Sequence, residues 1–134
     1  ERDLPAAFLR RCTFFHIDDP APDELARIVA QRFFSAERAG SPGTSEPKLP
    51  DFYRQLLDCF IAFRTQNEDS LQYRPGTSEL IDWTAALRQE GVDGGDLRAN
   101  IDALRRTAST VSKHKEDHLA LRKYLDGLQP PQAR

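Results

Sequence analysis

The sequence predicts a mainly α-helical protein, and two observations carry that prediction. Apolar residues recur at helical spacing in five segments from Pro22 onward. One stretch, residues 12–17, has the aromatic and β-branched content of a strand. A single strand satisfies its backbone only by pairing with another, and the sequence offers no second one. We therefore expect a helical bundle, preceded by a short helix and by one strand that belongs to a sheet elsewhere.

Composition bounds the class of protein. The 134 residues are 39% hydrophobic and 30% charged, enough for a soluble chain with one core. The net charge of -2, from 19 basic and 21 acidic residues, argues against nucleic acid or an anionic membrane as partner. No apolar run approaches the roughly 20 residues that cross a bilayer, and no signal-like N-terminus occurs. We expect a cytoplasmic protein, and the start on Glu1 without Met suggests a piece of a longer one.

The N-terminal segment predicts a short helix and then the strand. Residues 4–11 carry Pro5 in the first turn, where proline is tolerated, and end in Arg10 and Arg11. A guanidinium between a helix and a strand can project from the domain edge. There it can stabilise charge on a neighbour's phosphate, as an arginine finger does. The alternative is a surface salt bridge.

Two amphipathic helices are expected next, separated by an insertion. Residues 22–34 have Pro22 near the N-terminus and acidic residues in the first turn. Residues 35–48 contain two prolines and two glycines, and we interpret them as a flexible insertion without a site. Residues 50–66 predict the strongest helix, with a wide buried face made of two adjacent apolar stripes, Phe52, Leu56, Cys59, Phe60 and Phe63 beside Tyr53, Leu57 and Ile61.

The stretch 73–87 predicts a helix that starts beside an arginine. Arg74 precedes a Pro-Gly break, Thr77 or Ser78 can cap the helix, and Glu79 falls in its first turn. Its buried face is expected to hold Leu80, Trp83, Thr84 and Leu87. An arginine held at the N-terminus of a helix is placed to bind a phosphate, although most such arginines pair with a nearby carboxylate. For Arg74 the sequence leaves both interpretations open, a phosphate contact and a structural ion pair.

The C-terminal part predicts a turn and two more helices. Gly91 and Gly95 bound the turn. The first helix is marked by four apolar residues at helical spacing, Leu97, Ile101, Leu104 and Ala108. The second begins near Lys113 and keeps Leu121, Leu125 and Leu128 on one side. Gly127, Pro130 and Pro131 end it.

Metal and hydrolytic sites have little support. His114 and His118 lie four apart, as two imidazole ligands would, but the metalloprotease pattern needs Glu where Lys115 stands. We interpret residues 114–118 as a solvated charged face and predict no metal site. Cys12 and Cys59 have no close Cys or His partner and are expected to be buried thiols. A phosphate-binding Gly-x-x-x-x-Gly-Lys-[Ser/Thr] loop is absent, so the chain cannot hold nucleotide phosphates by itself.

Two motifs, in order, resemble one family. Residues 1–12, with the Phe14-Phe15-His16-Ile17 strand and Pro20, resemble the segment after sensor 1 in MoxR-like AAA+ ATPases. Residues 74–83, Arg-Pro-Gly-Thr-Ser-Glu-Leu-Ile-Asp-Trp, resemble the later lid motif of that family. The resemblance implies that residues 1–20 end the α/β ATPase core, with the arginine-finger helix and last strand. Residues 21–134 would then form the C-terminal helical lid, with the insertion at 35–48.

The family implies ATP hydrolysis in an oligomeric ring, coupled to remodelling of a client protein. Matching positions make Arg11 the first and Arg10 the second candidate for an arginine finger acting in trans. Arg74 is the candidate substitute for sensor 2 in cis, because the family usually has its arginine where this sequence has Ser78 and Glu79. The parent would bind ATP and Mg²⁺ through motifs preceding Glu1, so the resemblance implies that this fragment alone would bind neither and would not be an ATPase. The alternative is a helical protein-interaction module without a nucleotide role, in which the arginines are structural.

Overall fold

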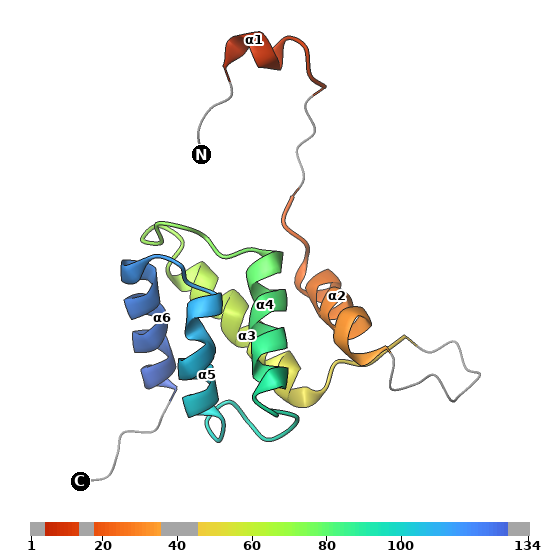
Figure 1. The fold of residues 1–134 in the computed structure, drawn as a ribbon, viewed down its shortest axis with the longest axis vertical. Helices are drawn as coiled ribbons and strands as arrows, with labels where there is room; N and C mark the ends of the chain where they lie inside the picture. The colour runs from red at the N-terminus through yellow and green to blue at the C-terminus, as the bar shows by residue number, and fades with distance from the viewer. Residues whose placement is uncertain (1–4, 14–17, 36–45, 129–134) are drawn as a thin grey trace.

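The computed structural model describes residues 5–13, 18–35 and 46–128 (Figure 1). In these residues the chain forms six α-helices and one 3₁₀-helix, η2, and no strand. The helices are α1 (Ala6–Leu9), α2 (Pro22–Phe34), α3 (Asp51–Gln66), α4 (Thr77–Gln89), α5 (Ile101–Thr107), η2 (Ala108–Thr110) and α6 (Lys115–Gly127). The prediction of a mainly helical bundle is confirmed. The expected strand falls largely on residues 14–17, and part of the expected insertion on residues 36–45, both outside the described residues.

The bundle is built around α3 and α4. Helix α2 packs against both, α4 packs against α5 and η2, and α5 packs against α6. Helices α3 and α6 meet where the rings of Phe63 and Tyr124 stack edge-on, 5.7 Å apart between centroids. On the far side, the Arg88 guanidinium of α4 lies 4.5 Å from the ring centroid of Phe34 in α2. Figure 1 shows α1 apart from this bundle.

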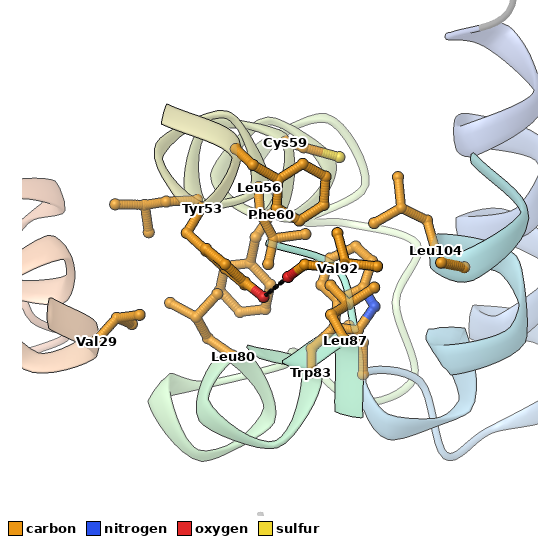
Figure 2. Close-up of a cluster of buried hydrophobic side chains, with 14 of the residues drawn as sticks. Val29, Tyr53, Leu56, Cys59, Phe60, Leu80, Trp83, Leu87, Val92 and Leu104 are labelled. Carbon is orange, nitrogen blue, oxygen red and sulfur yellow. Dashed lines mark hydrogen bonds between the residues drawn. The ribbon is translucent and has the colours of Figure 1, made fainter. Parts of the chain in front are cut away.

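Trp83 occupies the centre of the core, as the helical spacing predicts (Figure 2). Its side chain has no exposed surface, and its Nε1–H donates to the Thr107 hydroxyl at 2.9 Å. The other members of the predicted α4 face, Leu80, Thr84 and Leu87, are buried too. Burying an aromatic side chain whose one polar group is hydrogen-bonded contributes strongly to the stability of a small protein. This residue therefore joins α4 to α5.

The wide apolar face of α3 is confirmed. Both predicted stripes are covered, with only Ile61 half-buried. The Tyr53 hydroxyl, which lies among apolar side chains, donates to the carbonyl oxygen of Val92. Burial raises the pKa of this phenol to about 12. Helix α3 thus buries a wide face against its neighbours, while its opposite face is exposed.

The ends of α4 are fixed by local hydrogen bonds. Gly76, rather than the expected Thr77 or Ser78, is the N-cap, because the Glu79 carboxylate reaches back to accept the Gly76 N–H at 2.8 Å. At the other end Gly91 has φ of 79°. Its N–H bonds to the Arg88 carbonyl and that of Val92 to the Leu87 carbonyl, the two bonds of a Schellman motif. The predicted turn after α4 is confirmed.

Helix α5 begins at Ile101, later than the apolar spacing from Leu97 suggests. Residues 96–100 form a turn instead, in which the Asp96 carboxylate accepts the Ala99 N–H at 2.7 Å. The Asn100 amide also donates to the Gly94 carbonyl at 2.9 Å. Short polar side chains that bond their own backbone compete with helix formation. Leu97 is half-buried in this turn.

Candidate functional site

Two arginines from different elements converge at one end of the bundle. Arg74 Nη1 lies 3.0 Å from Asp19 Oδ2, and Arg64 Nη1 lies 3.9 Å from the same oxygen. Arg64 comes from the last turn of α3, Arg74 from the segment before α4, and Asp19 from the segment before α2. We call Arg64 and Arg74 the arginine pair. Both members of the pair approach the same carboxylate oxygen.

Arg64 is held by the bundle itself. Its side chain is only 9% exposed. The guanidinium donates from Nη1 to the Pro75 carbonyl at 3.4 Å and lies 5.6 Å from the ring centroid of Phe60. Arg64 was not among the residues predicted from the sequence. The signal was present, because position 64 lies four residues after Phe60 and so continues the buried stripe of α3.

The segment that carries Arg74 is tied to α6 by a buried carboxylate. Asp117 is 2% exposed and accepts the backbone N–H groups of Gln72 at 2.8 Å and Tyr73 at 2.9 Å. Charge-assisted hydrogen bonds to two successive amides fix the backbone direction just before Arg74. Asp117 was also missed by sequence reasoning.

The expectation that residues 114–118 form a solvated charged face is therefore wrong for Asp117. It is wrong in part for His118, which is half-buried with Nδ1 3.2 Å from the Ser112 hydroxyl. The physical reason is that α6 begins at Lys115, with His114 as its N-cap. This start turns Asp117 toward the 72–73 backbone, while Lys115 and Glu116 stay exposed.

A second buried carboxylate stands beside the Pro-Gly break. Glu79 is 6% exposed and lies within 3.7 Å of Lys113 Nζ. Burial acts to raise its pKa, but hydrogen bonds from the N–H of Gly76, from its own N–H and from the Ser78 hydroxyl, with the Lys113 charge, outweigh burial and lower the pKa. Glu79 therefore stays ionised and fixes the start of α4.

The two arginine-finger candidates lie elsewhere. Arg10 caps α1 and Arg11 follows it, and both are exposed. No ion pair joins either of them to another residue in ranges 5–13, 18–35 and 46–128. The structure does not bring them to the arginine pair. Of the candidates named from sequence, only Arg74 belongs to it.

The two cysteines differ in their surroundings. Cys12 is exposed, so the expectation that both thiols are buried is wrong for it. The segment after α1 has no core to enter, since α1 lies apart from the bundle (Figure 1). Cys59 is buried on α3, and burial raises the pKa of its thiol to about 12. Cys59 is therefore an inert thiol.

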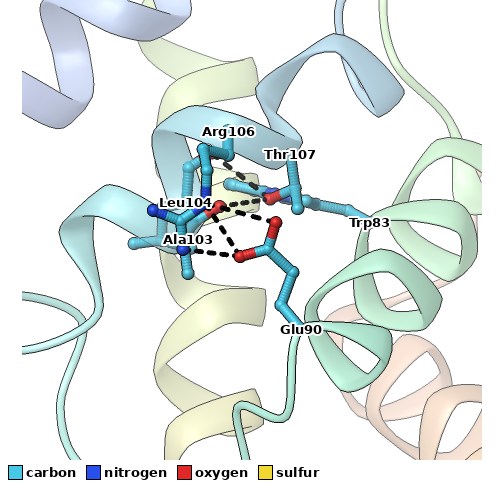
Figure 3. A network of polar contacts seen from close by, with 6 residues as sticks. All are labelled: Trp83, Glu90, Ala103, Leu104, Arg106 and Thr107. Atoms are coloured by element: carbon cyan, nitrogen blue, oxygen red, sulfur yellow. Dashed lines mark hydrogen bonds and ion pairs between the residues drawn. The ribbon is translucent and has the colours of Figure 1, made fainter.

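A second charged contact lies where α4 meets α5 (Figure 3). Arg106 Nη2 is 2.6 Å from Glu90 Oε2, and Nε donates to the same carboxylate. Hydrogen bonding from Arg106 lowers the pKa of Glu90. Both side chains lie at an open pocket of about 370 Å³. The pair joins the end of α4 to α5 through two contacts to one carboxylate, so we interpret it as structural.

Within the described ranges, no group of three His, Cys, Asp or Glu side chains is arranged to hold a metal ion. No helix in those ranges is both long enough and apolar enough to traverse a bilayer. Comparisons with protein-family models, with curated proteins and with solved structures each found no match.

Proposed function

We propose that this chain is the end of the ATPase core and the C-terminal lid of a MoxR-like AAA+ ATPase of the cytoplasm. In this proposal residues 1–20 belong to the core and residues 21–134 to the lid. The parent would couple ATP hydrolysis in a ring to remodelling of a client protein. The observation that carries the proposal is the convergence of Arg64 and Arg74 on one carboxylate oxygen, beside the segment that would lead from the core.

The arginine pair has the chemistry that a phosphate needs. In this proposal the carboxylate oxygen occupies the place of a phosphate oxygen, and two guanidinium groups approach it, at 3.0 and 3.9 Å. Guanidinium groups match the geometry and charge of phosphate oxygens. Arg74 would act in cis as the sensor 2 substitute, with Arg64 as a second donor behind it. Mg²⁺ needs oxygen ligands, which the resemblance assigns to residues before Glu1 together with the phosphate-binding loop.

Arg11 would act in trans, with Arg10 as the second candidate. Both are exposed at the end of α1, as a residue that reaches into a neighbouring subunit has to be. In a ring, each ATP site would then take Arg74 from its own subunit and Arg11 from the next. Other subunits and the client protein are the partners of this proposal.

One observation favours the alternative, a helical interaction module without a nucleotide role. Arg74 already has a carboxylate partner at 3.0 Å, as a structural arginine would. In that case the arginine pair serves only to attach the segment before α2 to the bundle. The presence of a Gly-x-x-x-x-Gly-Lys-[Ser/Thr] loop encoded upstream of Glu1 separates the two proposals.

Replacing Arg11 by Ala in the complete protein tests the proposed function. We expect ATP turnover to fall by a factor on the order of 10³ with little change in nucleotide affinity, because a finger acts on transition-state charge. Arg32→Ala is the control, since Arg32 is an exposed arginine in the last turn of α2. Turnover within a few-fold of the parent would remove Arg11 from this role, and Arg10→Ala would then test the second candidate.

A further inference from the structure

Asp19 holds the place that an external anion would take at the arginine pair. Its Oδ2 is the atom that both guanidinium groups approach. Asp19 and Arg74 are each about half exposed, at 52% and 48%, so water and ions reach the contact. Arg64 is only 9% exposed and faces this contact from inside. An internal carboxylate thus neutralises part of a charge that would otherwise attract ligands.

The three residues are fixed to different degrees. Arg64 is held by the Pro75 carbonyl and the Phe60 ring, and the backbone before Arg74 is held by Asp117. Asp19 lies in an irregular segment before α2, and within the described part of the chain its carboxylate pairs with these two arginines alone. The carboxylate can therefore leave while the Arg64 guanidinium and the backbone before Arg74 stay in place.

We propose that Asp19 is an internal competitor for a phosphate-type anion that binds the arginine pair. Two guanidinium groups carry two positive charges, and one carboxylate leaves one of them uncompensated. A phosphate group with two negative charges neutralises both, so it displaces Asp19. Displacement releases the Asp19 side chain from the arginine pair. Binding of the anion is thereby linked to this contact between the segment before α2 and the bundle.

Asp19 competes for the arginine pair weakly enough that an external anion can displace it. Ion pairs between exposed side chains change equilibria only a few-fold, because water and salt screen them. Asp19 therefore lowers the affinity for the anion without abolishing it. The identification of this anion as the phosphate of a nucleotide depends on the proposed function, whereas the competition itself does not.

Calorimetric titration of this chain with pyrophosphate at low salt tests the proposal. We expect Asp19→Asn to raise the affinity about fivefold. Asp23→Asn is the control, because it removes the same charge from an exposed position in the first turn of α2. An equal gain in both variants, or no gain in Asp19→Asn, would overturn the competition.

The arginines are tested in the same titration. Arg74→Gln should weaken pyrophosphate binding at least tenfold, since it removes a charge-assisted contact. Arg54→Gln, an exposed arginine on α3, is the control. Arg74 is half exposed, so this variant should keep the helical content of the parent, which circular dichroism checks. Binding that survives Arg74→Gln unchanged would place the anion elsewhere and refute the site.

Parallel titration of the complete protein with ATP separates this inference from the proposed function. If Asp19→Asn raises affinity for pyrophosphate in this chain and for ATP in the complete protein, the anion is the nucleotide phosphate. A gain for pyrophosphate alone supports the competition and counts against Arg74 as the sensor 2 substitute. Normal ATP turnover in Arg11→Ala would count against Arg11 as an arginine finger, but it would not affect the proposed competition between Asp19 and the anion.

Discussion

Replacing Asp117 by Ala removes the tie between α6 and the segment that carries Arg74. Two backbone N–H groups, at 2.8 and 2.9 Å from the carboxylate, lose their acceptor. A hydrogen bond to a charged group contributes about 1.5–3 kcal/mol. Gln72 and Tyr73 are exposed, so water replaces part of what is lost. We therefore expect the free energy of unfolding to fall by about 2–4 kcal/mol, less than the sum of two such bonds.

Urea unfolding with a matched control measures this loss. Glu116→Ala removes a charge from the same first turn of α6 but from an exposed side chain. It reports the contribution of the helix dipole, about 0.3–1 kcal/mol, together with that of a long, exposed hydrogen bond from Gln72 Nε2 to the Glu116 carboxylate at 3.4 Å. Asp117→Asn keeps one acceptor oxygen and should lose about half as much as Asp117→Ala. Faster amide exchange at Gln72 and Tyr73 should accompany both Asp117 variants.

The reasoning fails if Asp117→Ala and Glu116→Ala differ by less than about 0.5 kcal/mol, the usual range of surface substitutions. It fails equally if the exchange of the two amides does not change. Either result would mean that Asp117 does not fix the backbone before Arg74.

Two further changes test the core and the start of α4. Trp83→Ala should lower the free energy of unfolding in urea by about 3–5 kcal/mol, because Trp83 is fully buried and hydrogen-bonded. A loss below about 1 kcal/mol would contradict its central place in the core. The free energy of unfolding should also decrease as the pH falls below about 4.5, the ordinary pKa of a glutamate. Because the pKa of Glu79 is lowered by folding, its protonation favours the unfolded chain, so Glu79→Gln should reduce this decrease. An acid dependence that is the same in Glu79→Gln and the parent would exclude this contribution.

The helices were predictable because their signals are local. Periodic apolar residues place α2 at the expected bounds and α3 within one residue of them. The start of α5 was not predictable from apolar spacing, because the side chains of Asp96 and Asn100 bond the backbone nearby and delay the helix. Hydrogen bonds from short polar side chains to nearby backbone groups thus set where such a helix begins.

The candidate site was only partly predictable, for a different reason. Arg74 stands out beside a helix start, but Arg64 and Asp117 are charged residues in amphipathic patterns, where exposure is the usual outcome. Their partners are backbone groups, the Pro75 carbonyl and the Gln72 and Tyr73 amides, eleven and more than forty residues away. Backbone groups are present at every position, so no side-chain pattern marks them as partners.

Trp83 also gives the chain a built-in optical probe. It is the only tryptophan in the sequence, and its indole is fully buried between α4 and α5. Excited at the red edge of its absorption, the chain emits from this one environment, so a red shift reports opening of the core. The contact between Asp19 and Arg74 lies at the surface, with both side chains about half exposed. Displacement of that carboxylate should leave the emission wavelength unchanged, which allows ligand binding and unfolding to be followed separately in one unlabelled sample.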